Sequence, residues 1–218
     1  MAATKATLGV IADDAIGVSQ LSATGTASAS TYLRGDNAWG AVSSDWVLIS
    51  TVTASGDTYS DFATLDHTTY SSYQFVIEFT VDTDASHIDM LLAVSGTTYL
   101  EGTNYSYIDL GVQRTAGSLS INSNPNMAFI RFGTVTGNGN AADEGFGGVV
   151  DCHYFGDANR HALVNCTYSR MDNSGGASNL CWGTASAALL GSTAAITAVR
   201  FKANSGTHTG KIKMYGRK

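Results

Sequence analysis

The amino-acid sequence predicts an all-β protein, a jelly-roll-type antiparallel β-sandwich that carries an extended N-terminal arm. Apolar residues recur at every second position in many short segments, and segments rich in Gly, Asn, Ser and Asp separate them. Only 14% of the residues are charged while 44% are hydrophobic, a balance unlike that of helical bundles rich in Leu, Glu and Lys. A chain of 218 residues has room for one such sandwich and an appendage.

Period-two alternation defines the predicted strands. In residues 73–82 the odd positions are apolar and most even positions are polar, which predicts one buried and one solvated face. The same reasoning predicts buried positions at Ile88, Met90, Leu92 and Val94 of segment 87–94, at Ile108, Leu110 and Val112 of 105–114, at Val199 and Phe201 of 195–203, and at Ile212 and Met214 of 211–215. Further strands are predicted at 46–53, 59–65, 127–135, 146–155, 160–170 and 180–184, and segment 184–195 is the one stretch that could form a short helix.

Turn-forming residues connect these segments. Gly, Asn, Ser and Asp, which tolerate the left-handed backbone of tight turns, concentrate at 54–57, 137–145, 156–159, 172–178 and 204–207. The turn at 204–207 predicts that the last two strands form an antiparallel hairpin. The tripeptide Arg34-Gly35-Asp36 matches a cell-attachment signal, but with Asn37 it has the composition of a turn, which is the interpretation that we favour.

Residues 1–44 are predicted to form the arm and residues 45–218 the β-sandwich domain. The arm is rich in Ala, Ser, Thr and Gly, and its apolar residues recur too irregularly for a long helix or a regular strand. Alone it cannot bury enough apolar surface to offset its chain entropy, so it is either disordered or ordered by a partner. Its aliphatic residues favour ordering by a partner, because a solvated linker would not need them. The predicted anchoring and oligomerisation residues are Leu8, Val10, Ile11, Ile16, Val18, Leu21 and Trp39, the last expected to be buried where the arm joins the sandwich.

Several classes of function lack their usual signals in this sequence. No apolar run reaches 18 residues and the first residues do not resemble a signal peptide, so neither membrane insertion nor secretion is expected. A net charge of −6 disfavours nucleic acid as a partner. The three cysteines form no CxxC pair and leave one over, which predicts buried thiols in a protein assembled in a reducing cytoplasm.

No metal site, cofactor or catalytic set is predicted either. The five histidines have neither HxH nor HExxH spacing, so they are expected at the surface. The acidic residues Asp82, Asp84, Asp89 and Asp109 lack a calcium-loop pattern and are expected to be solvated. Motifs of hydrolases, nucleotide-binding proteins and dehydrogenases are absent, so the protein is not expected to be an enzyme.

Two stretches of the chain resemble proteins of a known class. Residues 13–39, which end in Thr31-Tyr-Leu-Arg-Gly-Asp-Asn-Ala-Trp39, resemble low-complexity repeats near the N-termini and in the shafts of tailed-bacteriophage fibre proteins. Residues 46–216 resemble a β-sandwich domain of phage fibre and other virion proteins, through segments such as Tyr70-Ser-Ser-Tyr-Gln-Phe-Val-Ile77 and Ser205-Gly-Thr-His-Thr-Gly-Lys-Ile-Lys-Met-Tyr-Gly216. The resemblance implies shape and attachment and no shared catalytic residues.

The resemblance implies a structural virion protein that is assembled in the host cytoplasm. An arm of 44 residues extends to about 150 Å at most, which favours a short fibre or spike-like appendage in host attachment over a long fibre. The expected partners are two further copies in a homotrimer, other virion proteins through the arm, and a host surface glycan. The alternatives are a capsid or neck decoration protein and a small polysaccharide depolymerase. The usual platform of such a depolymerase is a β-helix, whose regular rungs are absent from this sequence.

Two groups of residues are candidates for contact with a receptor or another subunit. Tyr99 and Tyr105 flank a predicted loop that contains Asn104, and their rings either stack on a sugar or cover an end of the sandwich. Further aromatic candidates are Tyr107, Tyr168 and Trp182. Residues 173–218 contain six of the 12 basic residues and none of the 18 acidic ones. Like charges across a hairpin repel, so a neighbouring subunit's acidic face, host lipopolysaccharide phosphates, or water and salt must compensate Arg200, Lys202, Lys211 and Lys213.

Overall fold

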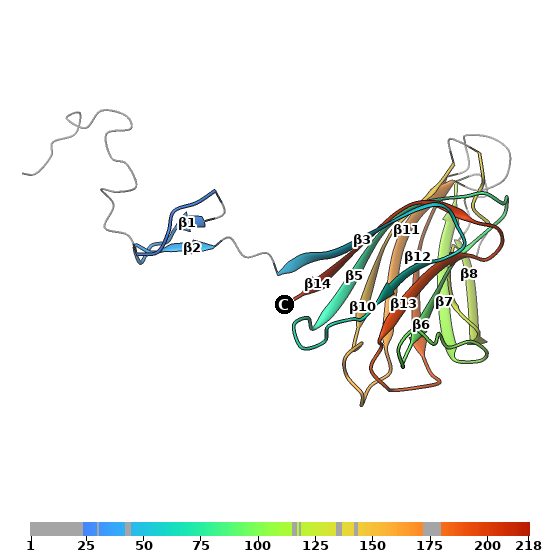
Figure 1. Ribbon diagram of the computed structural model, residues 1–218. Helices are drawn as coiled ribbons and strands as arrows, with labels where there is room; N and C mark the ends of the chain where they lie inside the picture. Colours follow the sequence, from blue (N-terminus) through green and yellow to red (C-terminus); the bar gives the residue numbers. More distant parts are fainter. Residues whose placement is uncertain are drawn as a thin grey trace, which may run out of the picture. The chain divides into compact units, whose positions relative to one another are not determined.

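The computed structural model describes residues 24–29, 31–41, 45–114, 117, 119–133, 137–141, 144–171 and 180–218. The chain divides into two units, Met1–Asp45 and Trp46–Lys218. Within the described residues every regular element is a β-strand and none is a helix (Figure 1), so the predicted all-β class is confirmed. This part of the chain accordingly contains no helix that could span a membrane.

In the first unit, β1 (Thr31–Leu33) and β2 (Trp39–Ala41) form an antiparallel hairpin in which Leu33 lies opposite Trp39. The N–H of Asn37 donates to the carbonyl oxygen of Arg34 at 3.0 Å, and Asn37 has a φ of 59°, which asparagine tolerates well. The predicted turn is therefore confirmed, whereas strands of three residues are too short to show alternation and were not predicted. Trp39 is half-buried within this unit, and its docking on the sandwich stays a prediction. Outside the described residues lie Leu8, Val10, Ile11, Ile16, Val18 and Leu21.

The second unit contains two antiparallel sheets that pack as a sandwich, as predicted (Figure 1). The large sheet has the order β3-β14-β5-β10-β11-β12-β7-β8 and the small sheet the order β4-β13-β6-β9. The large sheet consists of β3 (Trp46–Asp57), β5 (Ser72–Val81), β7 (Tyr105–Gln113), β8 (Leu119–Met127), β10 (Phe146–His153), β11 (Leu163–Met171), β12 (Leu180–Leu189) and β14 (His208–Arg217). The small sheet consists of β4 (Ser60–Ala63), β6 (Ile88–Ala93), β9 (Ile130–Phe132) and β13 (Ala198–Ala203).

Alternate side chains of the two sheets form the core. On β5 the five odd-numbered residues from Tyr73 to Val81 are buried, as their alternation predicts. The ring of Phe75 lies 5.1 Å from that of Phe62 on β4 and 5.2 Å from that of Phe201 on β13, both edge-on, so it joins the two sheets. The predicted buried positions on β6, β13 and β14 are confirmed for Ile88, Met90, Leu92, Val199, Phe201, Ile212 and Met214, while Val94 follows β6 and is half-buried.

The alternation predicted for β7 is wrong by one residue. Tyr105, Tyr107 and Asp109 face the core, whereas Ile108 is 48% exposed. The two tyrosines offer a large apolar area, and Asp109 accepts a buried hydrogen bond from the hydroxyl of Tyr168 at 2.8 Å. Because a shift of one residue turns every side chain of a strand to the opposite face, the aliphatic residues of β7 lie on the outside of the large sheet.

Two other expectations about the strands are corrected. β12 continues to Leu189 where a short helix had seemed compatible with the sequence, because its backbone pairs with β11 and β7 on both sides, which overrides the weak strand propensity of alanine. β13 and β14 do not form a hairpin, since β13 pairs with β4 and β6 and β14 pairs with β3 and β5. The turn at 204–207 instead connects the two sheets, and its Asn, Ser and Gly residues fit either connection.

Candidate interaction faces

The outer face of the small sheet, which we name the clamp face, holds Arg200 between two tyrosines. Arg200 on β13 lies opposite Asp61 on β4, and its guanidinium donates two hydrogen bonds to that carboxylate, at 2.7 and 2.6 Å. The rings of Tyr59 and Tyr99 lie 4.0 and 4.1 Å from the guanidinium carbon. The Asp61 carboxylate raises the pKa of Arg200. Bidentate pairing and cation–π contacts on the planar cation fix its orientation.

A second row of charges crosses the clamp face beside this one. Lys202 on β13 lies opposite Asp89 on β6, which in turn lies opposite Arg131 on β9. Arg131 donates to both oxygens of Asp89, at 2.7 and 2.9 Å, and its guanidinium lies 4.4 Å from the ring of Phe129. Asp89 is only 1% exposed, and burial raises its pKa although the hydrogen bonds from Arg131 oppose that shift. Carboxylates of the same sheet thus compensate the two predicted cations of β13.

The four predicted cations do not share one face. Lys211 and Lys213 point outward from β14 in the large sheet, on the opposite outer side of the sandwich from Arg200 and Lys202. Lys211 lies opposite Glu78 on β5, while Lys213 lies opposite an apolar residue. The repulsion expected across a final hairpin is therefore absent, because that hairpin does not exist.

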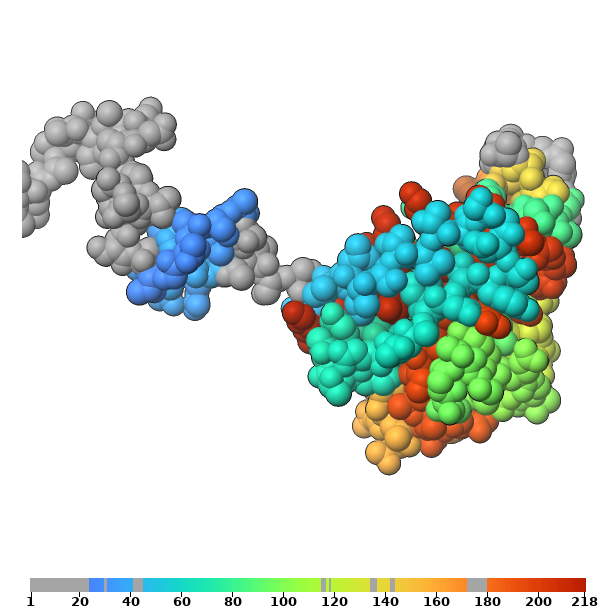
Figure 2. All heavy atoms as spheres, in the orientation of Figure 1, coloured from blue at the N-terminus to red at the C-terminus, as the bar shows by residue number. Residues whose placement is uncertain are grey.

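Of the three candidate residues around the loop after β6, only Tyr99 lies on the clamp face. Tyr105 is fully buried, and its hydroxyl accepts a hydrogen bond from the N–H of Leu92 at 2.9 Å, so it is a core residue and no receptor contact. Burial raises the pKa of Tyr105 to about 12. The carbonyl oxygen of Asn104 accepts from the N–H of Leu190 at 2.7 Å, which fastens this loop to the end of β12. Figure 2 shows the sandwich as spheres, with the green segment that follows β6 at its surface.

An apolar face that the sequence analysis missed lies on the outside of the large sheet. In the register, Leu110 faces Ile121, and Val112 lies between Leu119 on β8 and Trp182 on β12. Ile121 is 64% exposed and Trp182 53%. We name as the apolar face the outward residues Ile108, Leu110, Val112, Leu119, Ile121, Leu180 and Trp182. The signal was present in the alternation of β7, but we assigned that face to the core.

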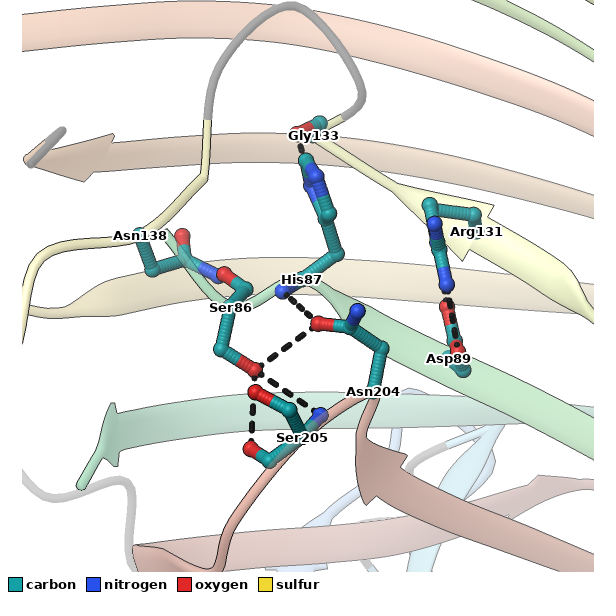
Figure 3. A network of polar contacts seen from close by, with 8 residues as sticks. All are labelled: Ser86, His87, Asp89, Arg131, Gly133, Asn138, Asn204 and Ser205. Atoms are coloured by element: carbon teal, nitrogen blue, oxygen red, sulfur yellow. Dashed lines mark hydrogen bonds and ion pairs between the residues drawn. The ribbon is translucent and has the colours of Figure 1, made fainter. Parts of the chain in front are cut away.

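A polar network fastens the loops at one end of the sandwich (Figure 3). The side-chain oxygen of Asn204 accepts from the N–H of His87 at 2.6 Å and from the hydroxyl of Ser86 at 2.9 Å. The amide of Asn138 donates to the carbonyl oxygen of Ser86 at 2.8 Å, and Nδ1 of His87 lies 2.8 Å from the carbonyl oxygen of Gly133. Segments that follow β5, β9 and β13 are thereby joined, which supports the ends of the strands that carry the clamp face.

The expectations for histidines and acids need correction, whereas the expectation that the three cysteines are buried thiols is confirmed. Cys152, Cys166 and Cys181 are buried free thiols. His208 is fully buried, and Asp109, like Asp89, is inaccessible to water, so these residues are neither surface histidines nor solvated acids. Among the residues that the structure describes, no group of three or more His, Cys, Asp or Glu side chains is placed to hold a metal ion.

The buried histidines predict that acid destabilises the sandwich. Burial lowers the pKa of His208, which contacts the hydroxyl of Ser60 at 2.8 Å, although Asp57 and Asp82 oppose the shift; burial also lowers that of His87. In the pH range around and below 6.5 the native state then binds fewer protons than the unfolded state. The free energy of unfolding therefore decreases as the pH is lowered through this range, by at most about 1.4 kcal/mol per pH unit for each histidine. Urea denaturation of wild type and His208→Gln measures this, and an equal pH dependence in both would contradict it.

The clamp predicts a difference between arginine and lysine. Arg200→Lys keeps the charge but loses the bidentate pair and the planar stack between Tyr59 and Tyr99, so it should lower the free energy of unfolding by about 1 kcal/mol. Arg160→Lys is the control, because Arg160 is 63% exposed and pairs with Asp157 at 3.5 Å, and its loss should stay within about 0.5 kcal/mol. Equal losses in both variants, measured by urea denaturation, would show that the clamp is no stronger than an ordinary surface pair.

Comparisons with known proteins identify no relative: no family model matches the chain, and no curated protein or solved structure is significantly similar to it.

Proposed function

We propose that this protein is a structural virion component of a tailed bacteriophage, a short fibre or spike-like appendage that contributes to host attachment. The observation that carries the proposal is the division of the chain after Asp45 into an N-terminal unit and a β-sandwich. The string from Thr31 to Trp39, which resembles phage fibre arms, forms a hairpin of its own in the first unit. An arm of this kind can be held by other virion proteins while the sandwich is displayed.

The strand order supports a jelly roll as the framework of the proposed appendage. β3-β14-β5-β10 are neighbours in the large sheet and β4-β13-β6-β9 form the small sheet. Two Greek keys interleave strands in this way. These eight strands, four from each sheet, form the jelly roll. The remaining strands of the large sheet, β7, β8, β11 and β12, are then insertions that widen it. Three of these four added strands carry the apolar face, which is therefore an addition to the framework and no part of its core.

The apolar face supports self-association, and we propose that it contacts a second copy of this chain in a homotrimer. Its five most exposed side chains expose 48% to 64% of their surface and present on the order of 500 Å² of apolar area, the upper end for monomeric proteins. A stable interface buries about 800 Å² on each partner, so this face supplies a large part of one. Its seven residues are uncharged, so this face of three copies can meet around a three-fold axis without repulsion.

The position of the protein on the virion tests the proposed function. Phage particles are labelled with a gold-conjugated antibody to residues 46–218 and viewed by electron microscopy. Label at the tail or baseplate is the expected result, whereas label confined to the capsid or neck would favour a decoration protein, which could use the same arm.

Deletion of residues 1–44 should abolish the label and leave a sandwich that still melts cooperatively in isolation.

A further inference from the structure

A hollow of about 570 Å³ lies between two loops of the sandwich, one before β5 and one after β10. The first loop contributes Tyr70 and Ser71, and the second contributes Tyr154, Asp157 and Asn159. The N–H of Ser71 donates to the carbonyl oxygen of Arg217 at 2.8 Å, so the hollow lies close to the C-terminus of the chain. Its volume is within the range of small-molecule sites.

We propose that this hollow, which we name the tyrosine hollow, binds a neutral saccharide. Tyr70 and Tyr154 provide aromatic rings, which pack on the apolar faces of sugar rings while their hydroxyls stay in water. The Ser71 hydroxyl, which donates to the carbonyl oxygen of Arg217 at 3.2 Å, can accept a hydrogen bond from a sugar, and the Asn159 carboxamide can both donate and accept. Among the described residues no Lys or Arg lines the hollow, and its one carboxylate, Asp157, does not attract an anionic ligand.

The neighbouring charges agree with a neutral ligand. Arg160 forms an ion pair with Asp157 at 3.5 Å, and its guanidinium also lies 5.0 Å from the centre of the Tyr154 ring. Its charge is thus balanced at the rim and does not attract a second anion. Both ring nitrogens of His67 have partners, because Nε2 lies 2.6 Å from the carbonyl oxygen of Ile196 and Nδ1 lies 3.3 Å from the hydroxyl of Tyr73. His67 is therefore a fixed wall of the hollow.

The backbone of the second loop is shaped to hold an aromatic ring at this place. Tyr154 has a φ of 61°, a left-handed conformation that is strained for a bulky residue and natural for Gly or Asn. Such strain concentrates at binding and catalytic sites, and a tyrosine here is explained if its ring is needed. A side chain on Gly156 would come within 2.8 Å of His67, so the close approach of the two loops depends on that glycine.

The tyrosine hollow gives the proposed attachment function a ligand class and depends on that function only for the source of the sugar. Saturation-transfer NMR on the full-length protein would use methyl glycosides of glucose, galactose, mannose and N-acetylglucosamine at millimolar concentration, with N-acetylneuraminic acid as the anionic probe. At least one neutral glycoside should receive saturation, and the anionic sugar should receive none. Saturation of no neutral probe, or of the anionic one alone, would overturn the proposal whatever the virion labelling shows.

Two matched variants place the binding. Tyr154→Asn removes the ring and suits the left-handed backbone, so it should melt no lower than wild type while its affinity for the neutral glycoside falls about tenfold or more. Tyr59→Asn is the control, because Tyr59 is 48% exposed, close to the 42% of Tyr154, and has an arginine over its ring, yet lies outside the hollow. It should bind like wild type. Undiminished binding by Tyr154→Asn, or an equal loss in both variants, would refute the assignment.

Discussion

Asp109→Ala is expected to lower the free energy of unfolding of the sandwich by about 3–5 kcal/mol, the usual loss when one member of a buried charged group is removed. Asp109 is 0% exposed and accepts a hydrogen bond from Tyr168 at 2.8 Å. Arg170 is 2% exposed, and both Asp109 and Arg170 act on the pKa of Tyr168, in opposite directions. Without the carboxylate, the buried hydroxyl of Tyr168 would lose its acceptor, and the negative charge that opposes the effect of Arg170 at this hydroxyl would be gone.

Two further variants separate this cause from a general effect of replacing aspartate. Asp109→Asn retains a hydrogen-bond acceptor for Tyr168 but no charge, so its loss should lie between those of wild type and Asp109→Ala. Asp84→Ala removes a carboxylate from an exposed turn, where the change should stay within about 0.5 kcal/mol. Urea denaturation at pH 7.5, above the range in which the histidines titrate, measures all three. A loss below about 1 kcal/mol for Asp109→Ala would show that the buried charge is unimportant.

Alternation predicted the strands whose two faces differ in chemistry. β5, β13 and β14 each alternate apolar side chains with charged or polar ones, as in Phe201 between Arg200 and Lys202, and their buried faces were predicted without error. β7 was assigned the wrong face because both of its faces are largely apolar. The choice depended on Asp109, whose burial is permitted by Tyr168 on a strand that is distant in sequence.

The candidate contacts were predicted only as far as one strand determines them. That Arg200 and Lys202 share an outward face follows from β13 alone, but the carboxylates that compensate them, on Asp61 and Asp89, come from strands that the sequence does not place beside it. The same limit explains the false final hairpin, since a short turn does not specify whether its strands join one sheet. The tyrosine hollow has no sequence signal, because a left-handed Tyr154 in the fold looks like any other tyrosine in the chain.

Ile121→Lys combined with Trp182→Ser is expected to convert the proposed homotrimer into a monomer. Each change removes a large apolar side chain from the apolar face, and the lysine adds a charge that an interface would have to desolvate. Truncation of central aromatic and aliphatic contacts weakens association by about 100-fold or more, which is about 2.7 kcal/mol. Sedimentation velocity of the full chain at micromolar concentration gives the mass of each species.

The interpretation of that experiment depends on a control in the same sheet. Leu48 is 51% exposed on β3, at the edge of the large sheet opposite to β8, so Leu48→Lys adds the same charge outside the apolar face and should leave the assembly intact. Because all three residues are exposed, every variant should melt close to wild type, and a monomer that melts normally excludes unfolding as the cause. A wild-type monomer would refute the proposed interface, and an assembly that survives the double change would place the contact elsewhere, with the arm as the segment to test next.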